Sequence, residues 1–308
     1  MKNRILLILT GFVLAVNFLH SQEDFQGING LNADNYPCVD AATGTEPLNY
    51  IIAAKLLGLE YEWIRSESGY YVRFENWEEI PQNLQRKFHC SQTHGAISNL
   101  IYYHELIGVS DNTPELIIVG RKMSADENYD AENQGVTLIE TPIALDALDF
   151  IVNSQNAVNS LTVEQIQNIY LGNITNWQEV GGADDEIIPF IRNANSGSQE
   201  MMKEYVMNNV DMPDWDVSYA DELKISSMSR VYEELRQHPN AICFTPHYYK
   251  EFIIRDTWGT TDFLKTLAVN GVMSDENSIK ELTYPFSRPV YVSIREDLDK
   301  NSRAYQLY

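Results

Sequence analysis

Cysteines and basic residues are scarce in this 308-residue sequence, and each shortage excludes a class of protein. The cysteines Cys38, Cys90 and Cys243 lie far apart, so at most one disulfide can form within the chain and no zinc-binding spacing exists. We expect all three to be buried thiols in strands. Only 22 basic residues accompany 44 acidic ones, and the net charge of −22 makes nucleic acid and anionic membrane surfaces poor partners.

Long apolar stretches are absent beyond the N-terminal region. There, Lys2 and Arg4 precede an apolar run over residues 5–19 that is short for a membrane span and is followed by Ser21 and polar residues. This pattern predicts a cleaved signal peptide over residues 1–21 and a periplasmic or otherwise exported protein. No cysteine directly follows the run, so we do not expect a lipid anchor.

Apolar segments with strand and helix patterns alternate along the rest of the chain, which is long enough for two lobes of comparable size. This alternation predicts an α/β protein with largely parallel sheets, whose ligands bind beyond the carboxyl ends of the strands. Two extended stretches, 136–153 and 284–293, are expected to cross between the lobes. Strands are predicted at 36–42, 59–77, 87–92, 116–119, 187–191 and 241–244, and helices up to 57 and at 96–107, 161–171, 198–210 and 228–237.

The loop RNANSGS at residues 192–198 places a cation just before a helix start. Ser196 can cap that helix together with Gln199, and Gly197 lets the main chain approach a ligand closely. Free N–H groups at the helix start and the Arg192 guanidinium would together suit a small oxyanion. The alternative is an ordinary capped helix behind a surface arginine.

Two earlier loops also join a strand to a helix. In the first, Thr43 and Glu46 have the spacing of a capping box, and Pro47 suits the first helical turn. In the second, Thr93 and His94 precede a helix, and we interpret His94 as a neighbour of the helix cap rather than as a ligand or catalytic group. Both loops are candidates for contact with an anion.

A further strand, 116–119, delivers the sequence GRKM at its carboxyl end. Its Arg121 could donate to a ligand or form a salt bridge between lobes. The acidic segment 126–133 lacks the glycine and closing glutamate of a calcium loop, so we expect a solvated turn there. Several such loops with two arginines among them favour an anion site over coincidental helix caps.

The segments ALDALDFIVN, SLTVEQIQNIYLGNITNWQEVGG and IPFIRNANSGSQ, between residues 144 and 199, resemble the phosphate-binding proteins that serve ABC phosphate importers. Weaker similarities are TGTEPL near the start, THG at 93–95 and GVMSDENSIKELTYPFSRPVYV at 271–292. The resemblance implies a two-lobe type II periplasmic-binding-protein fold with mixed, mostly parallel sheets flanked by helices and a hinge between the lobes. It places the first lobe at 22–147 plus 284–308 and the second at 148–283.

The same resemblance implies reversible capture of inorganic phosphate or a similar oxyanion for delivery to the membrane subunits of an ABC importer. The protein would be a monomer and not an enzyme, with no catalytic residue, cofactor or metal. The ligand-binding residues that it implies are Thr45, Glu46, Thr93, Arg121, Arg192, Ser196, Gly197 and Ser198.

Three departures from the family pattern bear on these expectations. Arg121 stands where the first-described members have an aspartate that accepts the ligand's proton, and arginine can only donate. Glu46 replaces a neutral residue, so we expect its side chain to turn away and leave only its N–H for the ligand. Family members normally continue beyond the position of Tyr308 through another helix and a closing segment, which would leave the first lobe here without a covering layer.

Two alternative functions remain open at this stage. An exported phosphatase-like hydrolase could use Ser196 or Ser198 as nucleophile, but no histidine, aspartate or metal-ligand cluster lies at a recognisable spacing to activate it. A module that binds phosphate for sensing or adhesion, without transport, would have the same sequence features.

Overall fold

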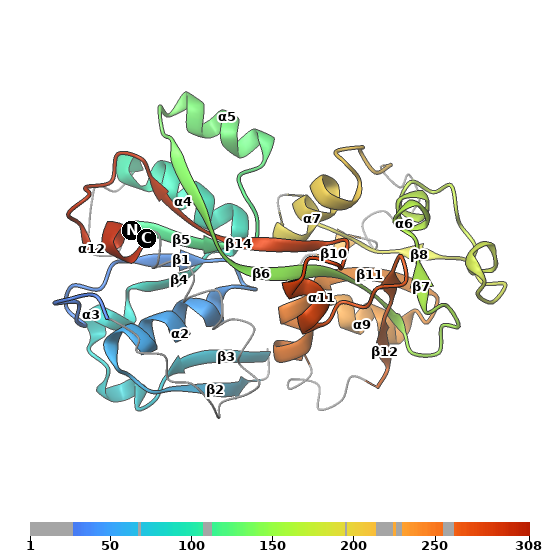
Figure 1. Cartoon of the computed structure of the whole chain (residues 1–308), viewed down its shortest axis with the longest axis horizontal. Coiled ribbons are helices and arrows are strands. Elements are labelled where there is room, and N and C mark those ends of the chain that lie inside the picture. Colours follow the sequence, from blue (N-terminus) through green and yellow to red (C-terminus); the bar gives the residue numbers. More distant parts are fainter. Residues whose placement is uncertain are drawn as a thin grey trace. The chain divides into compact units, whose positions relative to one another are not determined.

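The computed structural model describes residues 27–66, 69–106, 113–194, 196–213, 224–225, 230–254 and 262–308 (Figure 1). The predicted signal peptide therefore lies outside the described residues. Two compact units make up the chain, and it passes from unit 1 to unit 2 between residues 145 and 146 and back between 288 and 289. The sequence resemblance had implied changes between 147 and 148 and between 283 and 284.

Unit 1 contains a sheet centred on β1 (Val39–Ala41), which pairs in parallel with β4 (Phe88–Cys90) and β5 (Leu116–Val119). The strand β14 (Ser287–Arg295) adds to β5 in the antiparallel direction. Both β1 and β5 are buried along their whole length; β5 is accordingly a continuous apolar run, whereas β1 has the buried Asp40 at its centre. The β5 bounds match the prediction.

Helices pack on the strands of unit 1. The helix α2 (Glu46–Leu57) has Pro47 in its first turn and ends at Gly58, whose φ of 67° is the left-handed conformation that glycine adopts without strain. Its N-cap is Thr45, so the predicted capping box of Thr43 with Glu46 is wrong. The helix α4 (Gln92–Leu106) packs Ala96, Ile97 and Leu100 against Ile117 and Val119 of β5 in one apolar core.

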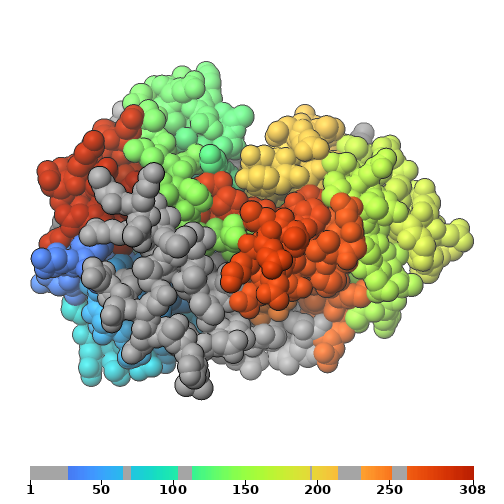
Figure 2. All heavy atoms as spheres, viewed as in Figure 1, coloured from blue at the N-terminus to red at the C-terminus, as the bar shows by residue number. Residues whose placement is uncertain are grey.

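The acidic segment predicted as a solvated turn forms the helix α5 (Ala125–Asn133) instead. Ser124 caps this helix, and Glu127 at its third position completes a capping box. Carboxylates in a first turn offset the positive end of the helix dipole, and α5 has Asp126 and Glu127 there. The helix lies at the surface of unit 1, where it is drawn in green (Figures 1 and 2). Two of its own residues, Glu127 and Ala131, are buried.

The remaining elements of unit 1 are short. The strands β2 (Tyr61–Ser66) and β3 (Gly69–Phe74) form a separate two-stranded sheet, followed by η1 (Trp77–Glu79) and α3 (Gln82–Gln85). The last helix, α12 (Arg303–Leu307), is capped by Ser302. Arg303 fixes it by donating to the main-chain oxygens of Asn29 and Gly30 at 3.0 and 3.1 Å.

Unit 2 is built on β6 (Leu138–Asn153), which begins in unit 1 and pairs antiparallel with β11 (Ala241–Pro246) and β12 (Leu264–Thr266). The strand β11 pairs in parallel with β8 (Ile188–Pro189). Two small parallel pairs accompany this sheet: β7 (Ser160–Leu161) with β13 (Ala268–Val269), and β9 (Ile191–Arg192) with β10 (Lys224–Ile225). The single strand predicted at 187–191 is thus split in two.

The helical elements of unit 2 are α6 (Val163–Tyr170), η2 (Trp177–Val180), α7 (Gly197–Met201), η3 (Met202–Val206), α9 (Arg230–Gln237), η4 (Tyr249–Ile254) and α11 (Glu276–Lys280). Apolar residues of α9 pack with Ile151, Phe190 and Cys243 in the core.

The three cysteines were predicted to be buried thiols in strands. Cys243 is buried in β11, and Cys38 is buried immediately before β1. Cys90 lies in β4 but is exposed, so the prediction of burial is wrong for this residue. None of the helices in the described ranges has the length and apolar character needed to cross a membrane.

Candidate anion-binding site

Arg192 ends β9 in unit 2, and its guanidinium is largely buried. Its Nη1 donates to Ser198 Oγ at 3.3 Å, and its main-chain N–H donates to Gln199 Oε1 at 2.8 Å. Burial lowers the pKa of Arg192 to about 10, so the side chain remains a cation at neutral pH. A buried cation that faces hydroxyl groups is suited to an oxyanion.

The helix that follows Arg192 begins at Gly197, one residue before the predicted start, and α7 continues directly into η3. Ser196 is its N-cap and accepts a hydrogen bond from the Gln199 N–H at 3.3 Å, as predicted. The Gln199 side chain, however, accepts from Arg192 rather than from the N-cap. The structure therefore places Arg192, Ser196, Gly197 and Ser198 together in one short loop at a helix start.

Two tyrosines near Arg192 were not identified from the sequence. Negative charge on Tyr232 or Tyr249 would raise the pKa of Arg192, so both side chains lie near its guanidinium, and Tyr232 OH lies 2.8 Å from Thr245 Oγ1. Burial raises the pKa of Tyr249 to about 12, so its hydroxyl is neutral at physiological pH. No motif links α9 and η4 to the loop along the chain, and only the fold brings these hydroxyls to Arg192.

Thr45 and Glu46 follow β1 in unit 1, but their polar groups serve local structure. Thr45 Oγ1 lies 2.5 Å from the Ile118 carbonyl oxygen, and the N–H groups of both residues donate to the Ala42 oxygen at 2.9 Å. The expectation that the Glu46 N–H remains available to a ligand is therefore wrong for this conformation. Burial raises the pKa of Glu46, against the effect of a hydrogen bond with the Cys90 thiol.

Thr93 is buried in the first turn of α4. This helix was predicted to start at Ala96, but it begins at Gln92, whose φ is 63°. His94 Nδ1 lies 2.9 Å from Glu127 Oε1, which agrees with the interpretation of His94 as a polar neighbour of a helix start.

Arg121 follows β5 and is only 1% exposed. Its Nη1 and Nη2 donate to Glu127 Oε2 and Oε1 at 2.6 and 2.9 Å, and Nη1 also donates to the Lys122 oxygen at 2.8 Å. Because Glu127 belongs to the same unit, this salt bridge is not the one between lobes that was one of the two alternatives for Arg121. The Arg121 Nε has no hydrogen-bond partner among the described residues and could donate to another acceptor.

The candidate site residues of unit 1 follow three strands that are adjacent in the sheet order β4-β1-β5. Thr93, Thr45 and Arg121 each follow the carboxyl end of one of these parallel strands, so their loops lie at the same edge of the sheet. Glu127 was not predicted as part of this site, although Ser124 and Glu127 have the S-x-x-E spacing of a capping box.

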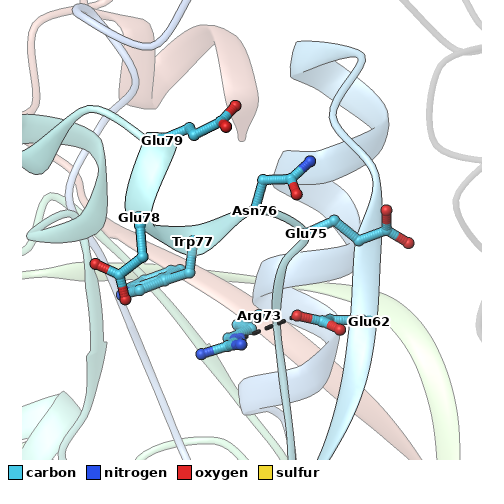
Figure 3. A pocket seen from close by; sticks show the side chains of 7 residues that line it. All are labelled: Glu62, Arg73, Glu75, Asn76, Trp77, Glu78 and Glu79. Carbon is cyan, nitrogen blue, oxygen red and sulfur yellow. Dashed lines mark hydrogen bonds and ion pairs between the residues drawn. The ribbon is translucent and has the colours of Figure 1, made fainter.

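A surface pocket of about 370 Å³ lies elsewhere in unit 1 and has the wrong charge for an anion. Among the described residues that line it, Arg73 is the one cation, and it is paired with Glu62 at 3.1 Å, as the dashed line in Figure 3 shows. The lining residues are Glu62, Arg73, Glu75, Asn76, Trp77, Glu78 and Glu79. Within the described part of the chain no cluster of histidine, cysteine, aspartate and glutamate could hold a metal ion.

Comparison with known sequences gives a family and several relatives. A family model described as a PBP superfamily domain matches residues 109–303. The phosphate-binding protein PstS of Borreliella burgdorferi is 27% identical over 154 residues, which cover 50% of this chain and 53% of that protein. Protein SphX of Synechococcus elongatus is 27% identical over 195 residues, covering 59% and 54%. The chain thus spans about half the length of these curated relatives.

Solved structures share the fold at low identity. A substrate-binding protein attributed to a phosphate ABC transporter of Clostridium perfringens, with bound phosphate, superposes with a TM-score of 0.59 at 19% identity and covers 89% of this chain and 91% of its own. An ABC-type phosphate transport receptor from Vibrio cholerae gives 0.54 at 21% identity, covering 87% and 89%. These structures confirm the predicted fold class. The chain belongs to the family described as the PBP superfamily domain.

Proposed function

We propose that this protein is an exported solute-binding protein that captures inorganic phosphate, or a closely similar oxyanion, for an ABC importer. The observation that carries the proposal is the loop 192–198, in which a buried guanidinium, two buried serine hydroxyls and a helix start come together. The names of the sequence relatives and the phosphate bound in a structural neighbour support the choice of ligand.

Capture requires no covalent step. Phosphate would lose its water and receive hydrogen bonds from the Arg192 guanidinium, the hydroxyls of Ser196 and Ser198, and main-chain N–H groups at the start of α7. Thr93 and the loop after β5 would supply the contacts from unit 1. In this mechanism the protein acts as a monomer outside the cytoplasm and passes its ligand to the importer's membrane subunits.

A hydrolase reaction has weaker support. Ser198 Oγ accepts a hydrogen bond from Arg192, and Ser196 Oγ accepts one from the Gln199 N–H. A nucleophilic serine needs a neighbouring base to remove its proton, whereas the Arg192 guanidinium and the Gln199 N–H only donate hydrogen bonds and cannot accept that proton. The contacts of both hydroxyls therefore favour binding over catalysis.

Calorimetric titration of the protein with phosphate, arsenate and sulfate at pH 6 and pH 8 tests this function. We expect phosphate to bind, and Arg192→Ala to weaken its binding about a hundredfold or more, because charge-assisted hydrogen bonds to a desolvated anion are lost. The exposed Arg230, whose side chain is 53% accessible in the same unit, provides the matched control Arg230→Ala. Equal phosphate affinities for the two variants would remove Arg192 from the site, and no binding by the unmodified protein would refute the function.

A further inference from the structure

The Glu127 carboxylate receives four hydrogen bonds although it is buried. Arg121 donates two of them, at 2.6 and 2.9 Å, the Ser124 N–H donates at 2.8 Å, and His94 Nδ1 lies 2.9 Å away. The Glu127 and Arg121 side chains are each 1% exposed. Burial raises the pKa of Glu127, but the hydrogen bonds and charge of Arg121, with the hydrogen bonds from Ser124 and His94, together lower the net pKa, so the group is a carboxylate at neutral pH.

These four donors belong to three different segments of unit 1. Arg121 lies in the loop after β5, His94 in the first turn of α4 next to Thr93, and Ser124 at the start of α5. A second carboxylate holds the same loop, because Glu140 Oε1 accepts from the Met123 N–H at 2.8 Å. One side chain therefore connects two of the loops that we assign to the anion site.

We propose that Glu127 is a positioning residue for the unit 1 part of the anion site. The inference depends on the proposed function, since it explains how that site is held in place. Glu127 fixes the loop after β5 through Arg121, and fixes the turn with Thr93 through His94. An oxyanion is bound tightly only when its donors are held in place before it arrives, because ordering loops on binding costs free energy.

Geometry separates this role from a purely stabilising one. A buried ion pair can often be exchanged for well-packed apolar side chains without loss of stability. Such an exchange would preserve the folded unit while removing the directional hydrogen bonds that set the loop positions. If Glu127 serves only the stability of unit 1, the exchanged protein will bind phosphate normally.

The first experiment compares phosphate affinity and melting temperature for Glu127→Gln, Glu127→Asp and Glu132→Gln. Glu132 lies on the same helix and is exposed, so Glu132→Gln is the matched control. We expect Glu127→Gln to weaken phosphate binding about tenfold or more, as losses of supporting contacts behind a binding site do elsewhere. Glu127→Asp should recover part of that affinity, and Glu132→Gln should bind as the unmodified protein does. Folded Glu127→Gln with the affinity of Glu132→Gln would overturn the inference.

A second experiment covers the case in which Glu127→Gln does not fold. The double variant Arg121→Met/Glu127→Met keeps the space filled, and we expect a folded protein with phosphate affinity reduced about tenfold or more. Normal affinity in this folded double variant would also overturn the inference.

Coupling to Thr93 provides a readout that stability alone does not change. Thr93→Ala should cost less affinity in a Glu127→Gln protein than in the unmodified one, because the turn is already displaced. Additive losses would contradict the role of Glu127. Failure of the unmodified protein to bind phosphate is a different result and would refute the proposed function itself.

Discussion

Each of the two units contains a buried carboxylate shared by a cation and a histidine, and the two arrangements differ. In unit 1, Glu127 accepts from Arg121 and contacts His94. In unit 2, Asp149 Oδ2 lies 2.6 Å from Lys250 Nζ and 2.9 Å from His247 Nδ1. Both oxygens of Glu127 have partners, whereas Asp149 Oδ1 has none among the described residues.

Position in the fold explains the difference. Glu127 lies on a helix at the edge of the sheet where loops meet, and its histidine is 40% exposed. Asp149 lies within β6 opposite Thr245 of β11, and its histidine is 15% exposed. The same combination of groups thus holds loops in one unit and occupies the interior of a sheet in the other, which implies different consequences of removing each carboxylate.

The largest effect on stability is expected from Asp149→Ala. It leaves the Lys250 ammonium buried with one counter-ion, Glu251 at 3.0 Å, and the free energy of unfolding should fall by about 3–5 kcal/mol. Urea unfolding followed by circular dichroism measures this change. Asp211, 90% exposed and 3.6 Å from Lys203, gives the control Asp211→Ala, which should change the unfolding free energy by less than about 0.5 kcal/mol. If Asp149→Ala lowers the free energy of unfolding no more than Asp211→Ala does, the expected contrast between Asp149 and Glu127 is contradicted.

Thr45→Val should have the next largest effect. The hydroxyl of Thr45 connects the start of α2 to the Ile118 oxygen of β5, and its removal leaves buried main-chain groups with fewer partners. We expect a loss of about 1–2 kcal/mol in unfolding free energy. If Thr45→Val lowers phosphate affinity but not the free energy of unfolding, Thr45 contributes to the anion site rather than to the stability of unit 1.

Ser302→Ala removes the N-cap of α12, where Ser302 Oγ accepts from the Tyr305 N–H at 3.1 Å. The expected cost is about 1 kcal/mol or less, since the helix is short and partly exposed. Replacement by aspartate, which can also cap, should restore most of the lost stability. Equal stability for the alanine and aspartate variants would mean that the cap contributes nothing measurable.

The smallest effect is expected in the pH dependence of unit 2. Burial lowers the pKa of His247, but Asp149 raises it more, and the net pKa is above the ordinary value despite the nearby Lys250 charge; Asp146 adds a further rise. A group with a raised folded pKa contributes stability below its unfolded pKa and loses it as pH rises through the folded pKa. Unfolding free energies of the unmodified protein should therefore decline relative to His247→Gln as pH increases above the ordinary histidine pKa. Parallel pH profiles would contradict this sign.

The sequence predicted the parts of this protein that depend on local patterns. The bounds of β5, the end of α2 at Gly58 and the assembly of the loop 192–198 all follow from apolar runs, glycine and capping residues that are near one another in the chain. The helix α5 was missed because it has little apolar periodicity and gains stability from its cap and from Glu127, which pairs with a side chain in the loop before it.

Contacts between distant segments account for the other misses. Nothing in the order of residues shows that Glu46 lies beside Cys90, or that Tyr232 and Tyr249 lie near Arg192. The run 187–191 was expected as one strand because its residues are apolar, yet β8 and β9 pair with different partners. Which strand pairs with which depends on the whole fold and not on local composition.

The hydrogen bond from the Arg192 amide to the Gln199 side chain has a kinetic consequence. It ties the residue that carries the cation to the first turn of the helix that carries the amide donors. This hydrogen bond resists separate movement of Arg192 and the helix start, so we expect the two to keep their relative position when an anion binds. Exchange of the Arg192 amide proton with deuterium should accordingly be slow both before and after saturation with phosphate.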